Sequence, residues 1–316
     1  MDIIRPDNHT FSLLQSFVEQ YEEKCVLLCS HIRRHNDKVY MLVDKEKTSN
    51  ASFLSLSSSS TEDMGTFINT EGKTIDSVYS LSDIKGVIHI GSTLFHCIPD
   101  TSCFSREDCE KLVHFIKEHM NDKKVKCISG ESKGTSFLAK LCELSGKVIY
   151  QENDYKIMTM THDFREDLTL PSLSDDDKII RCTEKEVDEL FNIQRKYLQD
   201  EVAPRGREVN DLEVKMTLRQ ILKHQLCLAL FSDGLACSKA NTNAIGINWV
   251  QIGGVYTHPF YRRNGYALHL VYTICKRALK VNKKISLFVK EKNQAAIELY
   301  NKLGFTSVGL YKIVYF

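Results

Sequence analysis

The chain has 316 residues, enough for two ordinary domains that each bury most of their own apolar surface. Its 42 basic and 41 acidic residues leave a net charge of +1, which excludes the broad positive field that holds nucleic acid or an anionic membrane. The 11 cysteines lack zinc-type spacing, no stretch reaches the roughly 18 apolar residues of a spanning helix, and the N-terminus has no export signal. The composition therefore predicts a globular, cytoplasmic protein that uses no nucleic acid, membrane or metal.

The first half alternates helix and strand patterns. Residues 10–23 have amphipathic helix spacing, and strand patterns follow at 25–30, 39–43, 51–56 and 86–90. The serine-rich tract 57–61 predicts a solvated loop. Ser105 and Asp108 form a capping pattern that opens a helix, after which we expect a strand, a helix and a strand at 125–129, 137–144 and 155–158.

Residues 166–178 are polar and contain Pro171 and three consecutive aspartates, which predicts a linker between a first domain at 1–165 and a second at 179–316. Thr183 and Glu186 form the capping box of the next helix. A helix over 212–223 and a β-hairpin over 226–240 are expected after it. The polar stretch 240–248 has two open interpretations, a hairpin loop or a wall of an acceptor site.

The most informative stretch begins at Trp249. A strand pattern covers 249–257, and Gly253 and Gly254 inside it indicate a bulge or a close backbone approach. The sequence R-R-N-G-Y-A follows at 262–267 and opens an amphipathic helix pattern. The start of a helix presents unpaired N–H groups and the positive end of the macrodipole, so a small residue at Gly265 lets a phosphate approach while the arginines add charge. The alternative interpretation is a solvated basic loop.

A second strand pattern at 284–289 and an Asn-capped helix pattern from Asn293, closed by Gly304, complete this region. A strand, an R-x-x-G-x-A turn, a helix, a strand and N-x-x-A-x-x-x-Y-x-x-x-G-F, in that order, resemble the GNAT superfamily of acyl-CoA-dependent N-acetyltransferases. The resemblance implies an α/β fold of the α+β type, built on a mixed sheet. Gly146 and Tyr155 are repeated at nearly equal spacing by Gly304 and Tyr311, which predicts tandem GNAT-like folds. The first half is degenerate, because residues 98–106 contain no glycine and one arginine.

The resemblance also implies where acetyl-CoA or coenzyme A binds as a co-substrate. The implied contacts come from the strand, the turn and the last helix: Val255, Tyr256, Thr257, Arg262, Arg263, Asn264, Gly265, Tyr266, Ala267 and Asn293. Tyr300 is implied as the acid that protonates the departing thiolate, and a core tyrosine is the alternative.

The general base is less clear from the sequence. Gln251 stands on the strand where many GNAT enzymes carry a carboxylate, and an amide takes no proton at neutral pH. Glu201 and Glu208 are therefore the candidate bases, with solvated surface charges as the alternative.

These features predict an acyltransferase that moves an acetyl or short acyl group from acyl-CoA to a small-molecule or peptide amine by direct attack in a ternary complex. The absence of a carboxylate on the strand keeps a non-catalytic acyl-CoA-binding sensor as the alternative. A nucleotide-binding module is disfavoured, because the turn has one glycine fewer than G-x-G-x-x-G. Gly130–Gly134 likewise lacks the ending of a phosphate loop.

Overall fold

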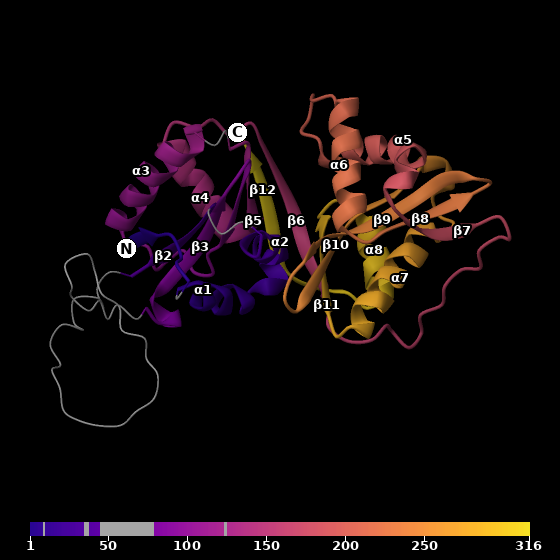
Figure 1. Ribbon diagram of the computed structural model, residues 1–316, viewed down its shortest axis with the longest axis horizontal. Helices are drawn as coiled ribbons and strands as arrows, with labels where there is room; N and C mark the ends of the chain where they lie inside the picture. The colour runs from indigo at the N-terminus through magenta and orange to yellow at the C-terminus, as the bar shows by residue number, and fades with distance from the viewer. Residues whose placement is uncertain (9, 35–37, 45–78, 123–124) are drawn as a thin grey trace, which may run out of the picture.

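A computed structural model describes residues 1–8, 10–34, 38–44, 79–122 and 125–316. The expected strand at 51–56 and the expected loop at 57–61 lie outside these ranges. The described elements form a mixed α/β structure on one twelve-stranded sheet, and the two halves of the chain lie side by side along it (Figure 1).

The two halves repeat one order of elements: a strand, two helices, three strands, a helix, a strand, a helix and a strand. In the first half these are β1 (Asp2–Ile4), α1 (Thr10–Glu19), α2 (Glu22–Ile32), β2 (Val39–Val43), β3 (Ile84–Ile90), β4 (Thr93–Cys97), α3 (Arg106–Asp122), β5 (Cys127–Glu131), α4 (Ser132–Leu144) and β6 (Gln151–Met160). In the second they are β7 (Lys178–Cys182), α5 (Val187–Tyr197) extended by the π-helical turn η5 (Leu198–Val202), α6 (Asp211–His224), β8 (Cys227–Ser232), β9 (Leu235–Ile245), β10 (Trp249–Thr257), α7 (Tyr266–Lys280), β11 (Lys284–Lys290), α8 (Gln294–Leu303) and β12 (Thr306–Tyr315). The predicted tandem arrangement is confirmed.

The last strands of the two halves are exchanged. The sheet order is β1-β2-β3-β4-β5-β12-β6-β11-β10-β9-β8-β7. β12 therefore pairs with β5 of the first half, and β6 pairs with β11 of the second. The two exchanged strands also pair with each other along their length, so the seam between the halves is continuous sheet.

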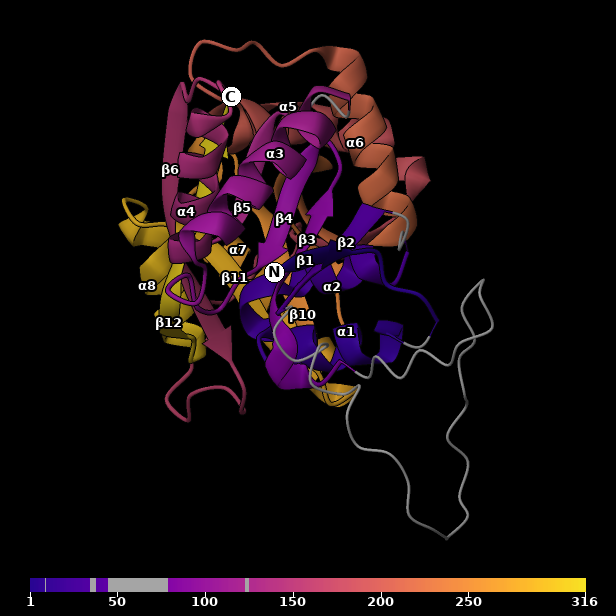
Figure 2. The same cartoon turned by 90° about the vertical axis from the view of Figure 1, so that its left-hand side faces the viewer.

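Helices cover both faces of the sheet. Side chains alternate along a strand, so Tyr40 and Leu42 of β2 pack in the cluster with α3 and α4, whereas Val39 and Met41 pack with α1 and α2. Figure 2 looks onto this half, with these helix pairs on opposite sides of the strands. In the second half α7 and α8 cover one face and α5 and α6 the other.

The expected strand at 25–30 is wrong, because these residues belong to α2. A short apolar run can be a strand or a buried helix, and tertiary burial decides between them. α2 also reaches the second half: Glu22 is fully buried and accepts hydrogen bonds from the backbone N–H groups of Ile247 and Asn248. The Ser286 hydroxyl donates to the carbonyl of Glu23 at 2.8 Å.

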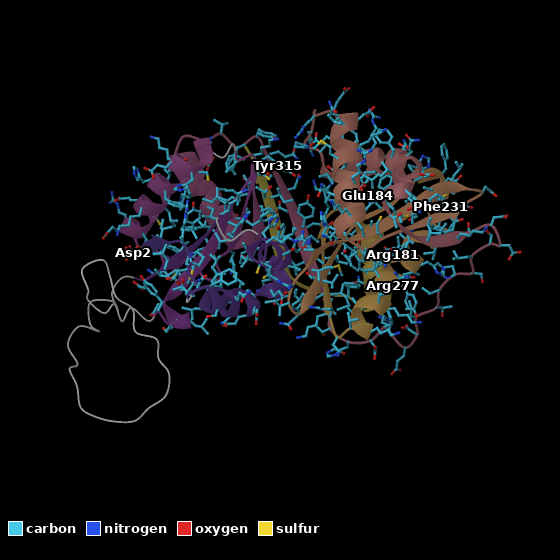
Figure 3. The ribbon with its side chains drawn as sticks, viewed as in Figure 1. Asp2, Arg181, Glu184, Phe231, Arg277 and Tyr315 are labelled. Carbon is cyan, nitrogen blue, oxygen red and sulfur yellow. The ribbon has the colours of Figure 1, made fainter. Side chains whose placement is uncertain are left out.

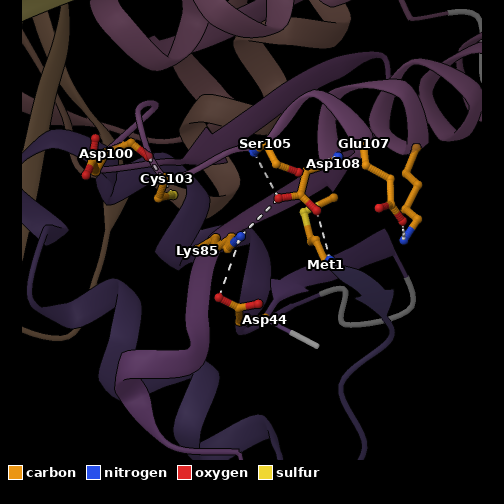
Figure 4. Close-up of polar contacts among 9 residues, drawn as sticks. Met1, Asp44, Lys85, Asp100, Cys103, Ser105, Glu107 and Asp108 are labelled. Atoms are coloured by element: carbon orange, nitrogen blue, oxygen red, sulfur yellow. Dashed lines mark hydrogen bonds and ion pairs between the residues drawn. The ribbon is translucent and has the colours of Figure 1, made fainter. Parts of the chain in front are cut away.

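The capping box expected at Ser105 and Asp108 is confirmed, with reciprocal contacts at 3.1 and 3.2 Å. Asp108 also accepts from Lys85 at 3.0 Å and from the Met1 amino group at 2.8 Å (Figure 4). Burial alone would raise the pKa of Asp108, but these donors hold it well below its usual range. The box expected at Thr183 and Glu186 is present as well.

Residues 240–245 are not a hairpin loop, because β9 continues to Ile245. Asn241 and Thr242 are buried in it despite their polarity. The sequence also left β4 unpredicted. Its buried polar residue, His96, interrupts the apolar pattern that would have indicated a strand.

Candidate active site

A gap opens between β10 and β11 in the middle of the second half. Their parallel pairing ends at Ile252 and Leu287, although β10 continues to Thr257 and β11 to Lys290. Beyond that point β11 keeps its pairing with β6 on the other side. The backbone of β10 from Gly253 onward therefore presents hydrogen-bonding groups to the gap, as the two glycines predicted.

The glycines also make room for a buried polar cluster under β10. The β9–β10 register shifts between Gly253 and Tyr256, and Gly254 has a φ of +61°, which favours glycine. A Cβ on Gly254 would lie 2.0 Å from Asn241 Oδ1 and 2.8 Å from Lys239 Nζ. A Cβ on Gly253 would lie 2.1 Å from Asn243 Nδ2. Gly254 is thus required by its backbone conformation and its close contact with β9, whereas a side chain at Gly253 would displace the exposed amide of Asn243.

Lys239 is the centre of this cluster and is fully buried. Its ammonium nitrogen donates to the Gly254 carbonyl at 2.9 Å and to Asn241 Oδ1 at 3.1 Å, and lies 4.8 Å from the centre of the Tyr197 ring. Desolvation lowers the pKa of Lys239. Sequence reasoning missed this residue. Side chains alternate along a strand, so Lys239 lies on the same side of β9 as Cys237 and Asn241, and this pattern could have identified it.

The turn before α7 has the expected shape. Gly265 and Arg263 have φ values of +78° and +72°. No side chain in the described part of the chain caps the first turn of α7, so its N–H groups face outward. A Cβ on Gly265 would lie 2.7 Å from Pro171 Cγ, and the Pro171 carbonyl is 2.7 Å from His269 Nε2. The linker therefore packs against the turn and runs beside α7, as Figure 1 shows.

One cleft of about 1130 Å³ joins the turn, the gap and the seam between the halves. Its lining includes most of the predicted coenzyme A contacts: Val255, Tyr256, Thr257, Arg262, Arg263, Gly265, Tyr266, Ala267 and Asn293. Asn264 is exposed and lies outside that lining. Asn293 is also the N-cap of α8, because its Oδ1 accepts from the Ala296 N–H at 3.2 Å.

Tyr300 lines the same cleft from α8. The side chain is only 5% exposed, and its ring lies 5.8 Å from that of Phe305. Burial raises the pKa of Tyr300 above its usual value, so the hydroxyl remains protonated at neutral pH. The residue thus belongs both to the core and to the cleft, which the sequence presented as alternatives.

The two candidate bases are placed differently. Glu201 lines the cleft from η5 and forms an ion pair with Lys290 at 3.1 Å. Glu208 is exposed and lies outside the lining, so the structure does not bring it to the cleft. Asp200, which sequence reasoning did not select, lines the cleft and accepts from the Tyr256 hydroxyl at 2.6 Å.

Gln251 also lines the cleft, two residues before the gap widens. The side chain is 1% exposed, and its Oε1 finds no hydrogen-bond partner among the described residues. A buried acceptor without a partner is costly, so this atom invites a donor from a bound molecule.

The corresponding gap in the first half is filled. β4 and β5 pair as far as Phe95 and Ser129, so His96 follows the last pair as Gly253 does in the second half. The imidazole Nε2 lies 2.8 Å from the Thr135 hydroxyl, and a Cβ on Gly130 would lie 2.2 Å from that nitrogen. Only about 10 Å³ remains beside it. The start of α3, the counterpart of α7, is capped by the Ser105 hydroxyl, which accepts from the Asp108 N–H at 3.2 Å.

Within the described ranges, no group of three or more His, Cys, Asp or Glu side chains is arranged to hold a metal ion. The helices of those ranges are too short or too polar to cross a bilayer.

Comparison with known families matches residues 188–305 to the acetyltransferase (GNAT) family. No curated protein matches the chain. Among solved structures, a tandem GNAT protein from the clavulanic acid biosynthesis pathway has a TM-score of 0.57 at 10% identity, covering 99% of this chain and 97% of that one. A Drosophila protein has a TM-score of 0.52 at 11% identity over 73% of each chain. A GCN5-related N-acetyltransferase from Kribbella flavida has a TM-score of 0.50 at 14% identity, covering 73% of this chain and 86% of its own.

At sequence identities of 10% to 14%, the similarity to these structures shows a shared fold and no more. Residues 188–305 thus match the acetyltransferase (GNAT) family, and the whole chain has a fold like that of a tandem GNAT protein.

Proposed function

We propose that the chain transfers an acetyl or other short acyl group from coenzyme A to an amine by direct attack. The observation that carries this proposal is the single cleft of about 1130 Å³ that joins the arginine turn, the gap beside β10 and Tyr300. Such continuity lets a phosphate at the turn and a thioester at the gap belong to one bound molecule.

The residues fit this co-substrate on their own chemistry. Arg262, Arg263 and the uncapped start of α7 would hold its phosphates, because forked donors and free N–H groups favour anions. The backbone from Gly253 to Thr257 would bond its amide groups and orient the thioester carbonyl. In the transfer the amine nitrogen forms a bond to the carbonyl carbon as the carbon–sulfur bond breaks. The nitrogen loses one proton and the sulfur gains one.

Tyr300 and Glu201 are the proposed proton-handling residues. The Tyr300 hydroxyl remains protonated and would donate a hydrogen bond to the departing sulfur, which takes its proton from solvent. Glu201 is the proposed acceptor of the amine proton, directly or through water, because it is the candidate carboxylate that reaches the cleft.

A thiol-release assay with acetyl-CoA and an amine panel tests the proposal. Transfer to at least one amine, with coenzyme A bound by calorimetry, is the expected result. Binding without transfer to any amine would favour the non-catalytic acyl-CoA sensor. Failure to bind coenzyme A would reject both functions.

A further inference from the structure

The cleft continues past the gap into the seam between the halves. There its wall is built largely by the exchanged strands and their neighbours, through Ser129 of β5, Tyr155 of β6 and Tyr311 of β12. Leu27 of α2 adds to it from the first half. The first half, whose own gap is closed by His96, thus forms part of the cleft of the second.

This seam wall is strongly aromatic. Tyr311 stacks on Phe288 with ring centroids 3.8 Å apart and an interplanar angle of 21°, and meets Tyr155 edge-on at 6.4 Å. Tyr311, Ile313 and Tyr315 all line the cleft, since alternate residues share one face of a strand. Tyr315 is labelled in Figure 3, where the two halves meet. Flat rings of this kind favour a flat apolar body through stacking and edge contacts.

The charges around the seam wall favour a cation. Asp200 and Glu201 line the cleft from η5, next to Tyr197 of α5. Among the described lining residues contributed by α2, β5, β6, β12, α5 and η5, none is Arg or Lys. Lys290 of β11 is engaged by Glu201 at 3.1 Å. That ion pair balances the charge of Glu201, and Lys239 already lies over the Tyr197 ring. The carboxylate left to attract an ammonium group is that of Asp200, which would repel a carboxylate, and the rings of Tyr155 and Tyr315 offer further faces.

Gln251 supplies the matching acceptor close to the gap. Gln251 lines the cleft, and its Oε1 is buried and lacks a partner among the described residues. An amine N–H is the kind of donor that would satisfy it. The aromatic wall, the carboxylates and this acceptor all border one cavity.

We propose, on the basis of the acyl transfer inferred above, that the acceptor is a primary amine carried on a flat aromatic body. Its ring lies against Tyr155 and Tyr311 in the seam, and its nitrogen donates to Gln251. The acceptor site is therefore shared by the two halves, which gives the degenerate first half a role in substrate binding.

Calorimetric titration of the full chain with 2-phenylethylamine, with and without coenzyme A, tests the proposal directly. Three compounds each remove one feature: 2-phenylethanol lacks the amine, phenylalanine adds a carboxylate, and spermidine lacks the ring. We expect 2-phenylethylamine to bind about tenfold or more tightly than each of them. A tighter complex with phenylalanine or spermidine would overturn the proposal.

Variants locate the binding to the seam wall. Tyr155→Leu and Tyr315→Leu should each weaken 2-phenylethylamine binding about tenfold, and Gln251→Met by a similar factor. Tyr272→Leu is the matched control, because Tyr272 lies on α7 outside the cleft lining and packs on Phe164. Unchanged coenzyme A affinity shows that a variant is folded.

The outcomes separate this proposal from the proposed function. Parent-like amine affinity in Tyr155→Leu and Tyr315→Leu would place the amine elsewhere and reject the seam site. Acetyl transfer to amines regardless of a ring would reject the aromatic acceptor and leave acyl transfer standing. Binding of 2-phenylethylamine without any transfer would reject the acyltransferase and leave the amine site.

Discussion

At Tyr300 the environment decides how a phenol can assist catalysis. Burial raises its pKa, whereas a departing thiol has a pKa of about 8.5, so complete proton transfer from Tyr300 to the sulfur is uphill. The hydroxyl can still donate a hydrogen bond to the charge that develops there. A hydrogen bond to a charged group contributes about 1.5–3 kcal/mol.

Tyr300→Phe should therefore slow turnover by about 10-fold to 150-fold and leave coenzyme A affinity unchanged. The ring keeps its packing against Phe305, so the fold is retained. Steady-state thiol release with the best amine measures the effect, and Tyr272→Phe is the control on α7. A rate within twofold of the parent would leave Tyr300 as a core residue alone.

Lys239 is a second residue whose surroundings determine its chemistry. Desolvation lowers its pKa in the folded protein, whereas a lysine in the unfolded chain titrates at about 10.4. Between those two values the unfolded chain binds more protons, so the free energy of unfolding rises with pH across that window. The contribution of Lys239 to the free energy of unfolding is greatest above the pKa of lysine in the unfolded chain. It is lost as the pH falls to the pKa of Lys239 in the folded protein.

Urea unfolding of the parent and of Lys239→Met over about pH 8–10.5 tests this linkage. The parent should gain stability relative to the variant as pH rises, by at most about 1.4 kcal/mol per pH unit. Methionine is unbranched like lysine, one heavy atom shorter, and has no proton to release. A stability difference that stays constant with pH would contradict the lowered pKa.

At the scale of elements, the turn before α7 combines ligand chemistry with packing. Any side chain at Gly265 would meet Pro171 and would also be strained at a φ of +78°. A β-branched residue there would disturb the packing of the linker as well as the approach of a phosphate. A loss of coenzyme A affinity in such a variant would therefore not show which of the two effects caused it. Arg263 allows a sharper test, because its φ of +72° suits glycine.

Arg263→Gly should preserve the turn and remove one guanidinium, raising the Kd for coenzyme A about tenfold and reducing its salt dependence. Calorimetry at two ionic strengths measures both. Arg277→Ala, in the last turn of the same helix and labelled in Figure 3, is the control for charge. If Arg263→Gly and the parent bound coenzyme A with equal affinity at low salt, the Arg263 guanidinium would not be a phosphate contact.

At the scale of the whole molecule, the described parts of the two halves differ in the space that their gaps leave. The gap of the second half belongs to a cleft of about 1130 Å³, whereas His96 leaves about 10 Å³ in the first. Calorimetry should therefore give one coenzyme A per chain, and Arg263→Gly should weaken that single site. Two equivalent sites would contradict the closed first half.

The exchanged strands predict that the halves are not independent folding units. A fragment of residues 166–316 lacks β6 and leaves both β11 and β12 without their shared neighbour. It should aggregate or unfold without cooperativity, because unpaired central edges expose backbone and apolar surface. A fragment of residues 147–316 keeps β6 and should be the better folded of the two by circular dichroism and urea unfolding. Equal stability of both fragments would contradict this role of β6.

Local sequence patterns were sufficient to predict much of the structure of the second half. The glycines of β10, the turn at 262–267 and the Asn293 cap each depend on backbone conformations that few residue types satisfy. The sequence alone therefore selected residues that the structure brings together around one cleft. The duplication was visible for the same reason, because equivalent turns recur at equal spacing. Capping at Ser105 and Thr183 is likewise local chemistry.

Only the tertiary structure decided the features that depend on partners distant in sequence. Whether residues 25–30 form a strand or a helix depended on burial against elements of both halves, which no local pattern records. The exchange of β6 and β12 brings Tyr155 of the first half into one cleft with Tyr311 and Gln251 of the second. Likewise, His96 closes one gap and Lys239 supports the other through contacts across the sheet. Side-chain alternation gives the face a residue occupies, but the neighbouring strand is determined by the packing of the whole chain.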